Sequence, residues 1–179
     1  AALTLAGSTA MHMLTNRARV RAGDWVLAIG GASGVGSAAI QIARQLGAHV
    51  ISTGSTEAKR TLAKNLGAEF VVDSTQTSWP AEVRKLTNKR GVDLVVHEAL
   101  SPRLVGILHD ASVSAGLTGL AKITTDIPDY HTTPVEAGEL AQAAGARHLL
   151  LYHIVPALPV PGLESVFLDG VSQAFSGGI

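Results

Sequence analysis

Runs of apolar residues alternate with amphipathic stretches along most of this chain. Five runs are almost continuously apolar, and they lie at 25–30, 49–53, 70–74, 93–100 and 148–155. Such runs are typical of parallel strands that are covered on both faces. Stretches with helical spacing of their apolar positions separate them, at 37–46, 57–66, from Trp79-Pro80 onward, and at 133–144. Strands that alternate with helices over short links predict a parallel sheet with right-handed crossovers.

Glycine punctuates this alternation. Four glycines each stand directly ahead of an apolar run: Gly47, Gly67, Gly91 and Gly145. Glycine tolerates the left-handed backbone conformation that ends many helices, so we expect each of the four to close a helix and lead into a strand.

The alternation loosens after the fourth run. We expect a helix at 102–115, a loop at 116–130, an extended segment around three prolines, and a last helix at 163–175. The fold class that follows is α/β: a Rossmann-like doubly wound parallel sheet in three layers, with strand order 3-2-1-4-5. We predict one domain over residues 1–179, in which residues 97–179 complete the sheet.

Composition excludes several classes of function. The 14 Lys and Arg residues balance the 14 Asp and Glu residues, so no net charge attracts nucleic acid or an anionic membrane. Cysteine is absent, which excludes disulfides, thiolate zinc sites and a cysteine nucleophile. Only 16% of the residues are charged, so we expect apolar surface that a partner or a homodimer contact covers. No apolar run approaches the ~18 residues of a membrane span, and the first residues lack the basic start of a signal peptide. We therefore expect a cytoplasmic protein, and one cut from a longer chain.

The stretch "GGASGVG" marks the turn between the first strand and the first helix. Gly31 permits a sharp turn, Ser33 and Gly34 lie where the backbone must approach a pyrophosphate, and Gly36 lets the helix pack closely. The N–H groups at the start of that helix can then receive phosphate oxygens, aided by the helix dipole. The alternative is a tight turn that binds nothing. Because strand, helix and second strand all fit, we favour dinucleotide binding.

The end of the second strand indicates which dinucleotide. Sites that prefer NAD usually carry Asp or Glu there, to bind the ribose 2′-hydroxyl. This chain has Gly54 at that place, followed by Ser55, with Lys59 and Arg60 one helical turn later. A small residue, a hydroxyl and two cations suit a 2′-phosphate, so NADP(H) is favoured over NAD(H). The alternative is that both cations are ordinary solvated helix residues.

Residues 1 to about 96 resemble the cofactor-binding domain of medium-chain dehydrogenases/reductases of the zinc-type alcohol dehydrogenase superfamily, especially its quinone oxidoreductase-like branch. The stretches "STAMHML", "RVRAGDWVLAIGGASGVGSAAIQIARQLGAHVISTGSTEAKR" and "LAKNLGAEFVVD" carry the resemblance. It implies an oxidoreductase module in which five residues line the pyrophosphate: Gly31, Ser33, Gly34, Val35 and Gly36. It further implies that Ser55 and Lys59 face the 2′-phosphate. Members transfer hydride from NAD(P)H to a carbonyl or an activated alkene, with a separate catalytic domain that supplies the substrate pocket.

From "HEALSPRLVGIL" onward the chain carries "VVHEAL", "DIPDYHTTPVEAGELAQAAGARHLLLYHIVP" and "GLESVFLDGVSQAF". By these stretches residues 96 to 175 resemble the C-terminal part of metallo-β-lactamase-fold hydrolases near the ribonuclease Z-like branch. This second resemblance implies His153 as a metal ligand and a proton-relay pair of Glu98 and His131. The chain lacks the H-x-H-x-D-H cluster that such a site requires, so zinc is not expected and His97, His131 and His153 are assigned to packing or strand ends. The two resemblances together predict a chimera.

These observations leave three functions open. The first is a module that binds NADP(H) without efficient turnover, because no catalytic domain is recognised and no residue is assigned a catalytic role. The second is a residual NADPH-dependent reductase of quinones or aldehydes. In both, the cofactor crevice lies at the carboxyl ends of strands one and four, with His97 and Glu98 near the nicotinamide. The third is a hydrolase remnant or an inert scaffold whose second part blocks the crevice.

Overall fold

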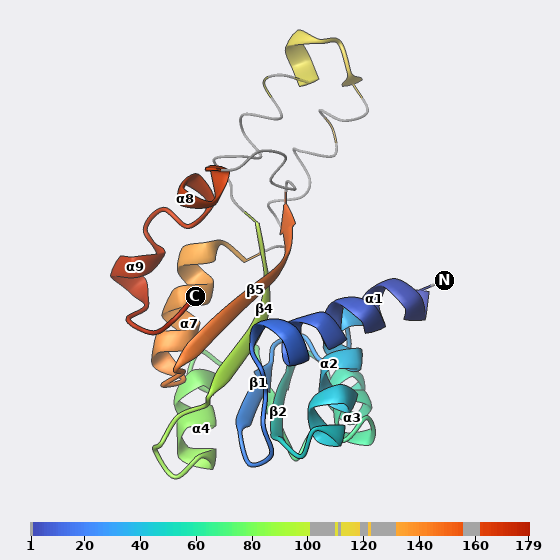
Figure 1. Ribbon diagram of the computed structural model, residues 1–179, viewed down its shortest axis with the longest axis vertical. Helices are drawn as coiled ribbons and strands as arrows, with labels where there is room; N and C mark the ends of the chain where they lie inside the picture. The colour runs from blue at the N-terminus through green and yellow to red at the C-terminus, as the bar shows by residue number, and fades with distance from the viewer. Residues whose placement is uncertain (1, 101–109, 111, 119–121, 123–131, 156–161) are drawn as a thin grey trace. The chain divides into compact units, whose positions relative to one another are not determined.

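The computed structural model describes residues 2–100, 110, 112–118, 122, 132–155 and 162–179 (Figure 1). Five strands form one sheet: β1 (Trp25–Ala28), β2 (His49–Gly54), β3 (Phe70–Asp73), β4 (Leu94–Leu100) and β5 (His148–Val155). Their order is β3-β2-β1-β4-β5, and the pairs of β1 with β2, β1 with β4 and β2 with β3 are parallel. The predicted fold class and strand order are thereby confirmed.

Helices alternate with the strands as the pattern predicts. They are α2 (Gly34–Gln45), α3 (Glu57–Asn65), α4 (Trp79–Leu86) and α7 (Pro134–Ala143). Right-handed crossovers put α2 and α3 on one face of the sheet and α4 on the other, and Figure 1 shows α2 and α3 together beside β1 and β2. The four glycines expected to end helices all have left-handed backbone, with φ of +82°, +109°, +86° and +68° at Gly47, Gly67, Gly91 and Gly145.

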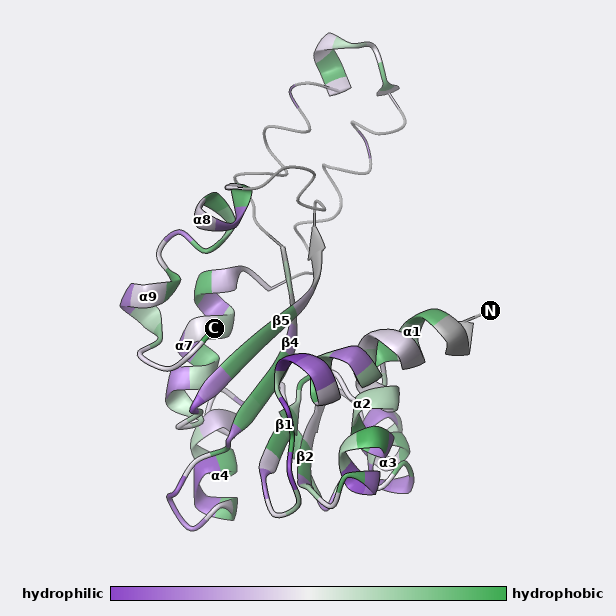
Figure 2. Ribbon diagram, in the orientation of Figure 1, coloured by the Kyte–Doolittle hydropathy of each residue, from purple (hydrophilic) through white to green (hydrophobic). Residues whose placement is uncertain are grey.

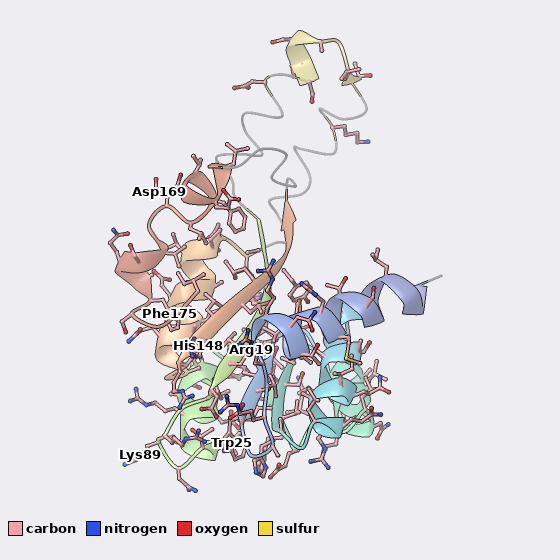
Figure 3. The ribbon with its side chains drawn as sticks, in the orientation of Figure 1. Arg19, Trp25, Lys89, His148, Asp169 and Phe175 are labelled. Carbon is pink, nitrogen blue, oxygen red and sulfur yellow. The ribbon has the colours of Figure 1, made fainter. Side chains whose placement is uncertain are left out.

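The strand interiors form the core, and Figure 2 shows β1 and β4 as mainly hydrophobic. Val26, Leu27, Val50 and Ile51 are fully buried, as is Ile40 of α2. At its amino end β1 begins with Trp25, whose ring stacks on His49 with the ring centroids 4.6 Å apart. Figure 3 shows Trp25 at the start of β1, which is the end of the strand opposite the glycine turn.

Two elements at the start of the chain were not predicted. Helix α1 (Ala2–Met11) runs into η1 (His12–Arg17), one turn of π-helix, and Ala10, Met13 and Leu14 of these elements are buried. Helix α1 packs along α2. Small residues such as Ala6 allow the close approach, since a Cβ placed on Gly34 would lie 3.6 Å from the Ala6 Cβ.

The end of the chain corrects one expectation. The single helix predicted at 163–175 is two short helices, α8 (Leu163–Phe167) and α9 (Val171–Ala174), because Gly170 between them adopts φ of +83°. Most of the helix predicted at 102–115, most of the predicted loop at 116–130 and the proline segment lie outside the described residues.

The chain forms two compact units. The first comprises Ala1–His97, Leu140–Leu150 and Gly177–Ile179, and the second comprises Glu98–Glu139 and Leu151–Ser176. In the second unit Ala99 and Phe167 are buried in a small core, and the partly buried side chains around them are Leu151, Leu163, Val166 and Leu168. Within the described residues, none of the helices has the length and apolar character that a membrane crossing requires.

Candidate dinucleotide-binding site

The turn after β1 is built around two glycines that a larger residue could not replace. A Cβ on Gly31 would lie 2.1 Å from the Ser52 Oγ and 2.7 Å from the Ile40 Cδ1. A Cβ on Gly36 would lie 2.4 Å from the Gly30 carbonyl oxygen. Gly31 therefore fits the turn against β2, and Gly36 fits the first turn of α2 against the loop itself.

Ser33 caps α2. Its backbone is extended, with φ of −75° and ψ of 167°, and its Oγ accepts a hydrogen bond from the Gly36 N–H at 3.1 Å. The Ser33 N–H itself donates to the Gly30 carbonyl at 2.8 Å. Two of the four N–H groups that a helix start leaves without an intrahelical partner are thereby satisfied. The Ser33 side chain is thus committed as an acceptor to the cap, and its hydroxyl proton is a separate donor.

The N–H groups of Gly34 and Val35 are the other two. Among the described residues no hydrogen-bond acceptor is found for either. Gly34 is exposed, as are Gly30 and Ser33 before it. Two adjacent N–H donors at the positive end of a twelve-residue helix are suited to the oxygens of a diphosphate.

A second turn follows β2. Gly54 is the last residue of that strand, and a Cβ there would lie 2.9 Å from the Arg60 Cγ and 3.0 Å from its backbone nitrogen. Thr56 caps α3 by accepting the Lys59 N–H at 3.3 Å. Ser55 and Lys59 are both exposed. The turn therefore presents a hydroxyl and an ammonium group beside a strand end without a carboxylate.

The sheet brings the two turns to the same edge. Ala28 of β1 is in register with Ser52 of β2, and the Gly30 N–H donates to the Thr53 Oγ1 at 3.0 Å. The predicted site residues thus lie in two turns at the carboxyl ends of two neighbouring strands: Gly31, Ser33, Gly34, Val35 and Gly36 in the first, and Gly54, Ser55 and Lys59 in the second. This is the edge at which open α/β sheets bind their ligands.

Arg60 does not share the position of Lys59. Its Nη1 donates to the Gly54 carbonyl at 3.0 Å and lies 3.2 Å from the Asp73 Oδ2 at the end of β3. Hydrogen bonds from the N–H and hydroxyl of Thr75, together with the charge of Arg60, hold the pKa of Asp73 below its ordinary value. Reasoning from sequence grouped Arg60 with Lys59 and missed Asp73. The spacing D-x-T after a strand is the signal that could have indicated a fixed carboxylate there.

The fourth strand agrees with the run predicted at 93–100. His97 and Glu98 lie inside β4, which continues to Leu100, and the register with β1 stops at Val96. His97 is buried. The side chains of Glu98 and His153 and all of His131 lie outside the described residues. In the part of the chain that is described, no group of three or more His, Asp or Glu residues could hold a metal ion.

Comparisons with known proteins agree with this geometry. Residues 34–105 match the family described as "Zinc-binding dehydrogenase". A phthioceranic/hydroxyphthioceranic acid synthase of Mycobacterium tuberculosis is 46% identical over 97 residues, which are 54% of this chain and 5% of that protein. A phenolphthiocerol/phthiocerol polyketide synthase of the same organism is 37% identical over 188 residues, which are 93% of this chain and 8% of that protein. The chain therefore spans less than a tenth of the length of these relatives.

Two solved structures are informative. The nucleotide-binding subdomain of the enoylreductase domain of PpsC from Mycobacterium tuberculosis is 36% identical, covers 54% of each chain and gives a TM-score of 0.50. A mycobacterial quinone oxidoreductase is 28% identical, covers 97% of this chain and 43% of its own, and gives a TM-score of 0.60. The fold is that of a Rossmann-type nucleotide-binding module of the dehydrogenase and reductase kind.

The interpretation of residues 96–175 as a metallo-β-lactamase-like segment receives no support. The similarity to the phenolphthiocerol/phthiocerol polyketide synthase covers 93% of the chain, and the similarity to the quinone oxidoreductase covers 97%. Both therefore continue well past residue 96. One kind of relative accounts for both parts of the chain, and a chimera is not needed to explain it.

Proposed function

We propose that this chain is the NADP(H)-binding module of a reductase of the enoyl reductase type. The observation that carries the proposal is the start of α2, where the N–H groups of Gly34 and Val35 lack an acceptor among the described residues and stand beside exposed backbone. The similarity to the nucleotide-binding subdomain of an enoylreductase domain supports it. These residues fit the diphosphate of a nicotinamide dinucleotide.

The second turn favours NADP(H) over NAD(H). Gly54 ends β2, so the strand offers no carboxylate to a ribose 2′-hydroxyl. Lys59 is exposed, lies in the first turn of α3, and supplies a positive charge for a 2′-phosphate. Ser55 adds a hydroxyl that can donate to the same group.

The chain's own residues bind and orient the cofactor. Bound NADPH supplies a hydride for a carbonyl or an activated alkene. The α2 amides fix the diphosphate, and the α3 turn fixes the adenosine end. The substrate-binding residues of such a reductase come from other parts of a longer protein, so we expect the 179-residue chain to bind the cofactor without efficient turnover. The second candidate, slow NADPH-dependent reduction of quinones or aldehydes, is favoured by the similarity to a quinone oxidoreductase.

Calorimetric titration with NADPH and NADH tests this function. We expect one NADPH per chain and weaker binding of NADH. Lys59→Ala should weaken NADPH binding about five- to tenfold and leave NADH binding unchanged, since only NADPH carries the 2′-phosphate. Lys85→Ala removes an exposed cation from the last turn of α4 and is the matched control, expected to change neither affinity.

Three results would contradict the proposal or select its alternative. Absence of binding by both nucleotides would refute a dinucleotide site. An equal loss of NADPH and NADH affinity in Lys59→Ala would remove the role given to Lys59. Oxidation of NADPH by the wild-type chain in the presence of a quinone would favour the residual reductase.

A further inference from the structure

The end of β2 carries a second cation that the proposed function does not use. Arg60 sits on α3 one residue after Lys59, and its guanidinium lies directly at Gly54. Gly54 is where a dinucleotide-binding strand discriminates between a 2′-hydroxyl and a 2′-phosphate. What Arg60 contacts there therefore bears on cofactor choice.

Arg60 is held by two acceptors. Its Nη1 donates to the Gly54 carbonyl oxygen at 3.0 Å and lies 3.2 Å from the Asp73 Oδ2. The contact with Gly54 is a hydrogen bond, and the contact with Asp73 is an ion pair. Strand pairing reinforces the arrangement, because Gly54 is in register with Asp73. Arg60 thus links α3 to the ends of β2 and β3.

Asp73 is itself fixed and remains charged. Its Oδ1 accepts the Thr75 N–H at 2.9 Å and the Thr75 hydroxyl at 2.7 Å, which leaves Oδ2 directed at Arg60. The two hydrogen bonds from Thr75 therefore hold the Asp73 carboxylate in one orientation beside Arg60. The Arg60 and Asp73 side chains are 29% and 33% exposed, so solvent weakens their attraction without abolishing it.

We propose that Asp73 is a positioning residue that holds Arg60 away from the 2′-phosphate and so limits the preference for NADPH over NADH. The proposal rests on the proposed function, because it concerns the same cofactor site. In the wild-type chain Lys59 supplies the positive charge that binds the 2′-phosphate, with the Ser55 hydroxyl beside it, while Asp73 neutralises Arg60. Removal of the Asp73 charge frees the guanidinium to form a charge-assisted hydrogen bond with the phosphate.

The test is the ratio of the NADH and NADPH dissociation constants, measured by calorimetry on the whole chain. Asp73→Asn should raise this ratio roughly two- to fivefold, the range expected when one partly exposed ion pair is exchanged for another. Asn keeps an Oδ1 acceptor for Thr75, so the turn after β3 is retained. Arg60→Ala should change the ratio less than about twofold, since Arg60 does not bind the phosphate in the wild-type chain.

The double variant Arg60→Ala with Asp73→Asn separates two causes. If released Arg60 is the cause, the double variant has the ratio of Arg60→Ala. If the gain persists in the double variant, Asp73 acts by simple repulsion of the phosphate and the proposal is wrong. A ratio unmoved by Asp73→Asn also overturns it, as does an Arg60→Ala variant that loses as much preference as Lys59→Ala.

A merely structural role would not produce this pattern, because a loosened turn weakens both nucleotides together and leaves the ratio unchanged. Should Asp73→Asn fail to fold, Asp73→Ser takes its place, since a serine hydroxyl can accept the Thr75 N–H. Failure of the proposed function is distinguishable: the wild-type chain then binds neither nucleotide. If it binds both and only the ratio stays fixed, this inference alone fails.

Discussion

At the residue scale, the glycines of the first turn differ in how much space surrounds them. Gly36 is enclosed, since a Cβ would lie 2.4 Å from the Gly30 carbonyl oxygen, which is backbone and cannot move aside easily. Gly34 is open, since its nearest neighbour would be the Ala6 Cβ at an ordinary contact distance of 3.6 Å. One glycine is therefore required by the fold, and the other is required only if a ligand approaches.

This difference predicts that an alanine at each of the two positions changes the free energy of unfolding by different amounts. Gly36→Ala should lower the free energy of unfolding by about 1–3 kcal/mol, because the added methyl group forces the turn apart. Gly34→Ala should leave it within about 0.5 kcal/mol of the wild type. Chemical denaturation followed by tryptophan fluorescence measures both. Equal stability of the two variants would show that the turn is not packed as described.

The lowered pKa of Asp73 predicts that the free energy of unfolding depends on pH. Hydrogen bonds from Thr75, and then the charge of Arg60, lower its pKa in the folded chain from the ordinary value of 3.8. A carboxyl group with a lowered folded pKa stabilises the fold above its unfolded pKa, and this contribution disappears as the pH falls through the folded pKa.

The stability difference between the wild type and Asp73→Asn should therefore be constant near neutral pH and narrow below about pH 4. Denaturant titrations at several pH values measure that difference. A difference that stays constant down to pH 2 would contradict the assigned contacts.

At the element scale, two helix-ending glycines meet where β4 and β5 begin. A Cβ on Gly91 would lie 2.0 Å from the Gly145 carbonyl oxygen. The side chain of Asp93, two residues after Gly91, is 7% exposed. It forms ion pairs with Arg90 at 2.6 Å and with Arg147 at 3.3 Å. It also accepts the Trp25 N–H at 2.8 Å, so one carboxylate joins the starts of three strands.

Gly91→Ala should consequently lower stability by more than about 2 kcal/mol, because left-handed strain and a backbone clash add together. Gly23→Ala is the matched control, since Gly23 also has a left-handed φ, of +84°, with no atom within 4 Å of a built Cβ. It should cost about 1 kcal/mol from strain alone. The same denaturation experiment measures both, and equal losses would rule out the close backbone approach.

Periodicity was sufficient for the regular elements, because strands buried on both faces and glycine-ended helices leave a direct trace in the sequence. It did not predict α1 and η1. Small residues such as Ala6 and Ala10 are compatible with several local structures, and the helix is favoured only once α1 packs along α2. Periodicity also merged α8 and α9, since only residues 168–170 separate them. The Arg60–Asp73 contact joins residues 13 positions apart across a strand end, and no local pattern reports it.

At the scale of the whole molecule, the residues that we propose to bind a nucleotide lie at one edge of the sheet. The start of α2 supplies N–H groups, the end of β2 supplies space, and the start of α3 supplies a cation. The amino edge of the same sheet carries the Trp25–His49 stack and the Asp93 contacts, which hold the strands together. The residues proposed to bind the nucleotide and the Trp25 and Asp93 contacts thus lie at opposite ends of the strands.

The relatives extend this account beyond the chain. Polyketide synthase proteins that match it are far longer, and the chain covers between 5% and 8% of the two described above. The resemblance of the second half to a hydrolase rests on short stretches of sequence, which carry less information than similarity along nearly the whole chain.

The most direct test is a ¹⁵N–¹H correlation spectrum of the labelled chain, recorded during titration with NADPH. The account predicts that the amide resonances of Gly34 and Val35 shift saturably and further than those of the Asp93 region at the opposite edge. If NADPH leaves both amides unmoved at saturating concentration, the start of α2 does not hold the diphosphate and the account is wrong.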